Sequence, residues 1–90
     1  MDRLFKNNGH IIEVKPKNNK YYTLKELQDM IGGYIEHIHL NNKYSVIVDE
    51  EGRLKNLSTN VNASNEFYKL MGFEYSICGN VLICETKRIK

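Results

Sequence analysis

TLKELQDMIGGYIEHIHLNNKYSVIVDEEGRLKNL, residues 23–57, contains a capped helix followed by a double-glycine break and then residues typical of strands. Thr23 is a preferred N-cap residue, and Glu26, three positions later, completes a capping box. One face of the helix is formed by residues at helical spacing, namely Leu24, Leu27, Gln28 and Ile31. Gly32-Gly33 then ends the helix, because glycine readily adopts the left-handed conformation that follows a helix C-terminus. This stretch therefore predicts a short amphipathic helix that leads into a β-sheet.

Strand patterns occur on both sides of this helix, and a second helix lies in the C-terminal half. Alternating, β-branched or aromatic residues predict strands at 10–14, 34–40, 44–49, 53–56, 73–78 and 81–86. Asn62 is the expected N-cap of a second helix over residues 63–71, which Gly72 ends. The predicted order is β-α-β-β-β-α-β-β. This order predicts an α+β fold in which a mostly antiparallel sheet carries both helices on one face.

The composition is that of one small globular domain. The 90 residues are 41% hydrophobic and 27% charged, and the net charge is only +2 because basic and acidic residues are interleaved. Neither the basic stripe typical of nucleic-acid-binding proteins nor the strongly acidic surface of a DNA mimic is evident. No stretch is apolar enough for a signal peptide or a membrane span, so we expect a cytoplasmic protein without membrane contact. We expect residues 1–8 and 87–90 to be frayed.

Motifs for catalysis or metal binding are not evident. Cys78 and Cys84 fall on opposite faces of the predicted closing hairpin, which argues against a disulfide, and two cysteines are too few for a zinc site. His37 and His39 share one face of a strand, but a third ligand is not identified, so we interpret them as a surface pair. The DEEG sequence at 49–52 lacks the alternating ligand spacing of a calcium-binding loop, so we interpret it as an acidic turn. We predict no enzymatic activity, no metal and no cofactor.

Three segments together resemble a known family. In chain order they are LKELQDMIGGYIEHIHL, VDEEGRLKNLSTNVNAS and GNVLIC, and they resemble domain of unknown function 3846 over roughly residues 12–84. One departure is Asn-Ala-Ser at the start of the second helix, where the family often has Ala-Thr. The resemblance implies no activity. It implies a genetic setting, because members of this family are small proteins found largely in bacteriophages, plasmids and other mobile elements.

Two functions are hypotheses at this point. The first is a non-enzymatic binding protein of a phage or mobile element that blocks or sequesters a host factor, such as a component of a defence system. Its target is either a host protein or a nucleotide-type signal molecule. The second hypothesis, which we rank below the first, is a nucleic-acid-binding accessory protein. It would contact phosphates through basic residues near both chain ends, namely Lys15, Lys17, Lys20, Lys87, Arg88 and Lys90.

A partner site and self-association are also predicted. The candidate site consists of polar and aromatic residues that follow the glycine break or flank the acidic turn: Tyr34, Glu36, Asp49, Glu50 and Asn60. An aromatic ring with nearby acceptors can hold a base, a sugar or an arginine-rich surface. The alternative is structural, with Tyr34 packed on the first helix, Asn60 bonded to loop backbone and the acids solvated. The last predicted strands are apolar on both faces, so an exposed edge there predicts a homodimer.

Overall fold

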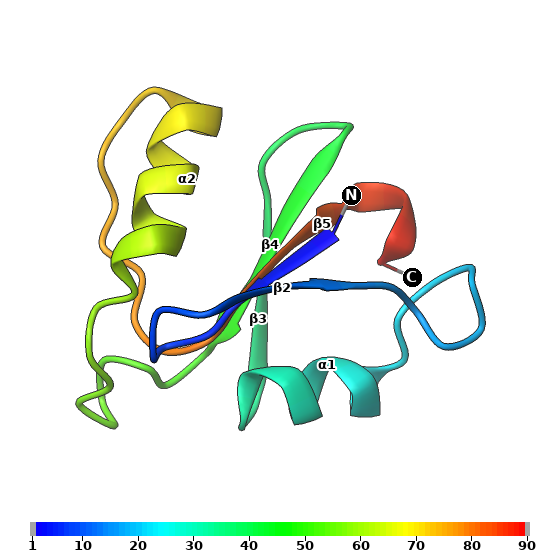
Figure 1. The fold of residues 1–90 in the computed structure, drawn as a ribbon, viewed down its shortest axis with the longest axis horizontal. Coiled ribbons are helices and arrows are strands. Elements are labelled where there is room, and N and C mark those ends of the chain that lie inside the picture. Colours follow the sequence, from blue (N-terminus) through cyan, green and yellow to red (C-terminus); the bar gives the residue numbers. More distant parts are fainter. Residues whose placement is uncertain (1, 90) are drawn as a thin grey trace.

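A computed structural model describes residues 2–89 and shows a five-stranded antiparallel sheet with one helix on each face (Figure 1). The elements are β1 (Asp2–Phe5), β2 (Ile11–Val14), α1 (Leu24–Ile31), β3 (Ile35–His39), β4 (Tyr44–Asp49), α2 (Val61–Met71), β5 (Val81–Glu85) and a 3-10 turn (Thr86–Arg88). The strand order across the sheet is β2-β1-β5-β4-β3, and every neighbouring pair is antiparallel. The predicted α+β class, with a mostly antiparallel sheet and two helices, is confirmed.

The two helices cover opposite faces of the sheet, whereas the sequence predicted both on one face (Figure 1). Side chains alternate along β4, so Val46 and Val48 pack with α2 while Ile47 packs with α1. The residues of β5 alternate between the same two clusters. Because both faces of these central strands are apolar, each face needs its own helix to exclude water.

Helix α1 begins and ends as predicted. The Thr23 hydroxyl accepts the Glu26 N–H at 3.2 Å, and the Glu26 carboxylate accepts the Thr23 N–H at 3.0 Å. Gly32 follows the helix with a φ of 89°, in the left-handed region. Leu27 and Ile31 are buried against the sheet. The capping box and the glycine stop therefore fix the length of α1 and the place where the chain enters β3.

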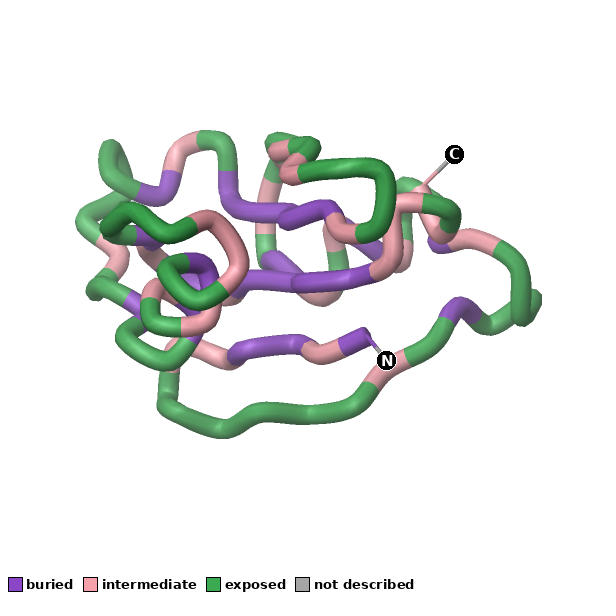
Figure 2. Tube along the Cα trace, turned by 90° about the horizontal axis from the view of Figure 1, so that it is seen from above, coloured by how far each residue is buried: buried purple, intermediate pink, exposed green. Residues whose placement is uncertain are grey.

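Strand β5 lies in the centre of the sheet, between β1 and β4, and not in a closing hairpin (Figure 2). It is buried on both faces, which explains the uninterrupted apolar sequence VLIC at 81–84. Both edges of β5 are already paired, so residues 73–78 have no place in the sheet, and only Cys78 forms an isolated bridge, with Thr59. The exposed edge at 81–86 that motivated the prediction of a homodimer is therefore not present.

Residues 53–56 form part of a turn and not the predicted strand. The Lys55 N–H donates to the Glu51 carbonyl oxygen at 2.9 Å, and the Leu57 N–H donates to the Gly52 carbonyl oxygen at 3.0 Å. Strand β4 already has a neighbour on each side, so a further strand could not pair with it. The acidic turn is consequently longer than predicted, and it curls back beside the end of β4.

Within the segments predicted to be frayed, Asp2 and Arg88 are hydrogen-bonded to the rest of the described chain. The Asp2 carboxylate is buried and accepts the Tyr22 hydroxyl at 2.6 Å. At the other end, the Tyr22 N–H donates to the Arg88 carbonyl oxygen at 2.9 Å. Met1 and Lys90 lie outside the described residues. Within the described part of the chain, no helix is long and apolar enough to cross a membrane.

Candidate functional site

Four of the five predicted site residues lie together at one end of the β3–β4 hairpin. Asp49 is opposite the residue between Tyr34 and Glu36. The Glu50 N–H donates to the Tyr34 carbonyl oxygen at 2.9 Å, which holds the start of β3 against the acidic turn. Tyr34 is 66% exposed, so it does not pack on α1 as the structural alternative required. Glu36 and Glu50 are also exposed.

Asn60, the fifth predicted residue, is buried inside the fold. It is the N-cap of α2 in place of the predicted Asn62, and its Oδ1 accepts the Ala63 N–H at 3.1 Å. Its Nδ2 donates to the carbonyl oxygens of Phe5 and Gly79, both at 2.8 Å. Because both amide hydrogens are used within the chain, Asn60 has no donor left for a ligand. It joins α2, β1 and the segment before β5.

Asp49 is likewise engaged by its own chain, with its side chain only 2% exposed. Its Oδ2 accepts from Lys55 Nζ at 3.0 Å, and its Oδ1 accepts the Glu51 N–H at 2.8 Å. Gly33 lies against this ion pair, since a Cβ added there would be 2.6 Å from Lys55 Nζ and 3.1 Å from Asp49 Oδ2. The second glycine of the break therefore leaves room for the buried carboxylate and its lysine.

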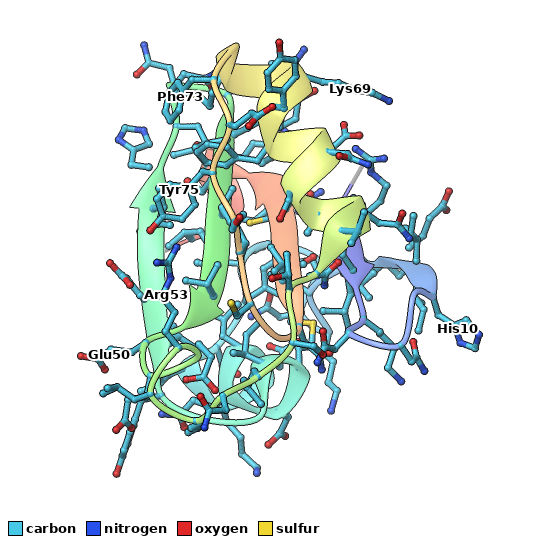
Figure 3. The ribbon with its side chains drawn as sticks, turned by 90° about the vertical axis from the view of Figure 1, so that its left-hand side faces the viewer. His10, Glu50, Arg53, Lys69, Phe73 and Tyr75 are labelled. Atoms are coloured by element: carbon cyan, nitrogen blue, oxygen red, sulfur yellow. The ribbon has the colours of Figure 1, made fainter. Side chains whose placement is uncertain are left out.

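A shallow cleft of about 130 Å³ opens beside this hairpin on the α2 face of the sheet, and we call it the Tyr75 cleft. Its lining includes Glu36, Glu50, Arg53, Leu54 and Tyr75. The Arg53 guanidinium lies over the Tyr75 ring, 5.7 Å from the ring centroid. Figure 3 shows Tyr75, Arg53 and Glu50 in a row along one side of the molecule. An aromatic ring, an arginine and two exposed carboxylates thus share one cleft.

Three exposed aromatic residues, Tyr68, Phe73 and Tyr75, extend the cleft toward α2, and we call them the aromatic ridge. Each is about half exposed, at 50%, 50% and 47%. The buried Phe67 ring lies 5.5 Å from the Phe73 ring and 5.6 Å from the Tyr75 ring, between centroids, so it supports two of the three from below. A second hollow of about 270 Å³ is lined by Tyr68 and Tyr75. Exposed aromatic side chains gathered over two hollows are typical of a contact surface.

The sequence did not predict this ridge, because it predicted a strand at 73–78 in its place. Phe73, Tyr75 and Ile77 alternate as strand residues do, but only Ile77 is buried. A usable indication was present in the sequence, because VLIC at 81–84 is apolar at every position. Such a run indicates a strand that is covered on both faces and paired on both edges, which leaves residues 73–78 without a partner. The wrong strand prediction at 53–56 likewise kept Arg53 from being predicted as a site residue.

The two histidines of β3 are exposed and share one face of the strand, as predicted, with ring centroids 6.2 Å apart. His37 Nε2 is 2.8 Å from Ser45 Oγ, and partial burial together with the neighbouring His39 lowers the pKa of His37. Ser45 is completely buried, and its Oγ also lies 3.0 Å from Thr86 Oγ1, so the hydroxyl is held between two side chains of the same chain. His10 lies on the far side of the molecule (Figure 3). Among residues 2–89, no group of three or more His, Cys, Asp or Glu side chains could hold a metal ion.

The two cysteines are free thiols in different surroundings. Cys84 is buried in β5, where desolvation, with Asp2 nearby, raises the pKa of the thiol to about 12. It therefore does not form the reactive thiolate near neutral pH. Cys78 is partly exposed and lines the Tyr75 cleft.

The basic segments near the two chain ends lie side by side, at the opposite end of the sheet from the acidic turn (Figure 1). Arg88 Nη1 donates to the carbonyl oxygens of Asn19 at 3.0 Å and Lys20 at 3.4 Å. Tyr22 and Ile89 form a parallel bridge beside this contact. Arg88 is thus held against the backbone of the loop that carries Lys15, Lys17 and Lys20.

The family model described as domain of unknown function 3846 matches residues 1–89. No curated protein and no solved structure matches the chain.

Proposed function

The chain belongs to the family of domain of unknown function 3846, and we propose that it is a non-enzymatic binding protein of a phage or other mobile element. In this role it inhibits or sequesters a host factor in the host cytoplasm, such as a component of a defence system. The Tyr75 cleft is the observation that supports binding, because it joins exposed aromatic surface to charged groups. Tyrosine and arginine, the residue types found at Tyr75 and Arg53, are enriched among the side chains that dominate the binding energy of protein interfaces.

The chemistry of the cleft favours a protein target over a nucleotide-type signal molecule. Its volume of about 130 Å³ is well below the range of about 300–1,000 Å³ typical of small-molecule sites. The carboxylates of Glu36 and Glu50 would also repel the phosphates of a nucleotide. The one arginine that lines the cleft, Arg53, already donates a hydrogen bond to the Ser76 carbonyl oxygen at 3.1 Å. Those two carboxylates suit a cation, and the neighbouring Tyr75 and Leu54, which is 83% exposed, suit an apolar side chain. We therefore expect the target to present an arginine or lysine next to a large apolar residue.

A random peptide library, selected against the purified chain, tests the proposed target chemistry. Enriched peptides should carry a basic residue beside an aromatic or large aliphatic one. Tyr75→Ala should weaken the binding of such a peptide at least about tenfold, since truncating a central interface aromatic costs about 2 kcal/mol. Glu50→Lys should weaken it as well, because the substitution reverses the charge that faces the peptide cation.

Leu24→Ala is the matched control for these variants. Leu24 is 60% exposed but belongs to α1, on the opposite face of the sheet, so its truncation should leave peptide affinity unchanged. Enriched peptides without a basic residue would contradict the proposed target chemistry. Equal affinity of the wild type and Tyr75→Ala would contradict the proposed site.

Nucleic-acid binding is the second candidate function, and the meeting of the two basic segments supports it. Arg88 contacts the loop that contains Lys17 and Lys20, so these cations and Lys87 share one end of the molecule. Lys87, however, is 3.3 Å from the Glu85 carboxylate, and part of the positive charge is therefore neutralised. A salt titration of DNA and RNA binding tests this function, because phosphate contacts weaken steeply as salt rises. Absence of binding at about 50 mM salt would exclude it.

A further inference from the structure

We infer that β2 is a self-association edge, along which two copies of the chain pair antiparallel with Ile12 of one copy opposite Ile12 of the other. This surface is separate from the Tyr75 cleft, and the inference goes beyond the proposed binding function. It also differs from the homodimer predicted from the sequence, whose pairing strand is now in the centre of the sheet.

The outer edge of β2 is one of two strand edges left open by the sheet, the other being that of β3. All residues of β2 are at least partly exposed, and the strand forms an uncovered border of the molecule (Figure 2). Ile11 is 48% exposed and Ile12 is 42% exposed, although they point to opposite faces. By contrast, the exposed residues of β3 are Glu36, His37 and His39. Polar and charged side chains protect an open edge from pairing, so β2 is the less protected of the two.

The hydrogen-bonding pattern of β2 shows which backbone groups are available. The Lys6 N–H donates to the His10 carbonyl oxygen at 2.8 Å, so His10 directs its backbone toward β1. Hydrogen-bonded and non-hydrogen-bonded positions alternate along an antiparallel pair. Ile12 therefore also faces β1, and Ile11 and Glu13 direct their N–H and C=O groups outward. A second copy can satisfy these outward groups.

The side chains favour a register with Ile12 on the two-fold axis. A two-fold axis perpendicular to the sheet makes the interface self-complementary and keeps equivalent faces on the same side. With Ile12 on this axis, Ile11 of one copy exchanges backbone hydrogen bonds with Glu13 of the other, and the two Ile12 side chains meet directly. A shift that placed Glu13 on the axis would set two carboxylates opposite each other, which destabilises a sheet pair. A second copy in this register therefore fits β2 with an apolar contact and no opposed like charges.

Cysteine substitutions along β2 test both the dimer and its register under mild oxidation. Opposed Cα atoms at a non-hydrogen-bonded position are about 4.5 Å apart, within the range of a disulfide. In the inferred register, equivalent positions one residue away from the axis are diagonal neighbours about 8 Å apart, beyond the limit of about 7 Å. Ile12→Cys should therefore form a disulfide-linked dimer, whereas Ile11→Cys and Glu13→Cys should form no more than the unsubstituted chain, whose own thiols set the background.

Light scattering without any cysteine substitution provides the second measurement. The mass should rise above that of the 10.5 kDa chain toward twice that value as concentration increases. Ile12→Lys should restore the monomer mass, because it sets two lysines opposite each other on the axis, and Leu54→Lys, an equally apolar-to-basic change on an exposed turn, should not. Equal cross-linking at all three positions, stronger cross-linking at Ile11→Cys or Glu13→Cys than at Ile12→Cys, or a monomer mass at every concentration would overturn the inference.

Discussion

Replacing Asn60 by alanine should destabilise the fold more than any other single change at the predicted site. The side chain caps α2 through the Ala63 N–H and bridges the carbonyl oxygens of Phe5 and Gly79. Loss of an asparagine N-cap costs about 1 kcal/mol. Each buried carbonyl left without its donor costs about 1–2 kcal/mol more. The expected loss in the free energy of unfolding is therefore about 3–5 kcal/mol.

This loss is large for a chain of 90 residues, because domains of that size have a total stability of about 5–13 kcal/mol. Urea denaturation followed by circular dichroism measures it as a shift of the midpoint at constant slope. Asn60→Ser separates the two roles, since serine keeps the cap but cannot bridge both carbonyls, and it should recover about 1 kcal/mol. Asn62→Ala is the control, because the exposed Asn62 makes a single bond to the Gly9 carbonyl oxygen. A loss below about 1 kcal/mol for Asn60→Ala would refute the structural role and return Asn60 to the list of ligand-binding candidates.

Three further variants or conditions test the surroundings of the site. Burial lowers the pKa of His37 in the folded state, so the unfolded chain takes up the proton more readily. Stability should be complete above the ordinary histidine pKa of about 6.5 and fall as pH drops below it, with a shallower fall for His37→Gln in denaturation series. Gly33→Ala should displace the Lys55 amine from its buried carboxylate and lower the midpoint, and most of this effect should vanish in a Lys55→Ala background. Iodoacetamide should label Cys78 before Cys84 in the native chain, as followed by peptide mass spectrometry, because burial and a pKa of about 12 suppress the Cys84 thiolate.

The sequence was sufficient for the elements that local rules specify. The Thr23–Glu26 capping box, the stop at Gly32 and the hairpin between β3 and β4 follow from neighbouring residues, and all are present in the structure. Strand position within the sheet depends instead on which edges are already paired. The residue patterns at 53–56 and 73–78 are compatible with strands. No strand edge of β4 or β5 is left for them to pair with, however, because both strands lie in the centre of the sheet.

The same limit applies to the candidate site. Tyr34, Glu36 and Glu50 were found because they adjoin a recognisable break and turn, and they are indeed exposed at one end of the hairpin. Asn60 is a candidate by residue type alone, but its side chain is directed into the fold by bonds to Phe5 of β1 and to Gly79 before β5, both distant in sequence. Tyr75 reaches the site only because residues 73–78 cross the α2 face outside the sheet. Such a placement depends on the whole topology and not on local spacing.

The most direct test of the proposed function is capture of a host protein through the Tyr75 cleft. Immobilised wild-type chain, Tyr75→Ala and a basic-end control, Lys20→Ala, are exposed to the same bacterial host lysate, and bound proteins are quantified by mass spectrometry. We predict a host protein that is retained by the wild type and the control but lost with Tyr75→Ala, whose folding is verified by its melting temperature. Equal retention by all three chains, or loss only with Lys20→Ala, would contradict the assignment of function to the cleft.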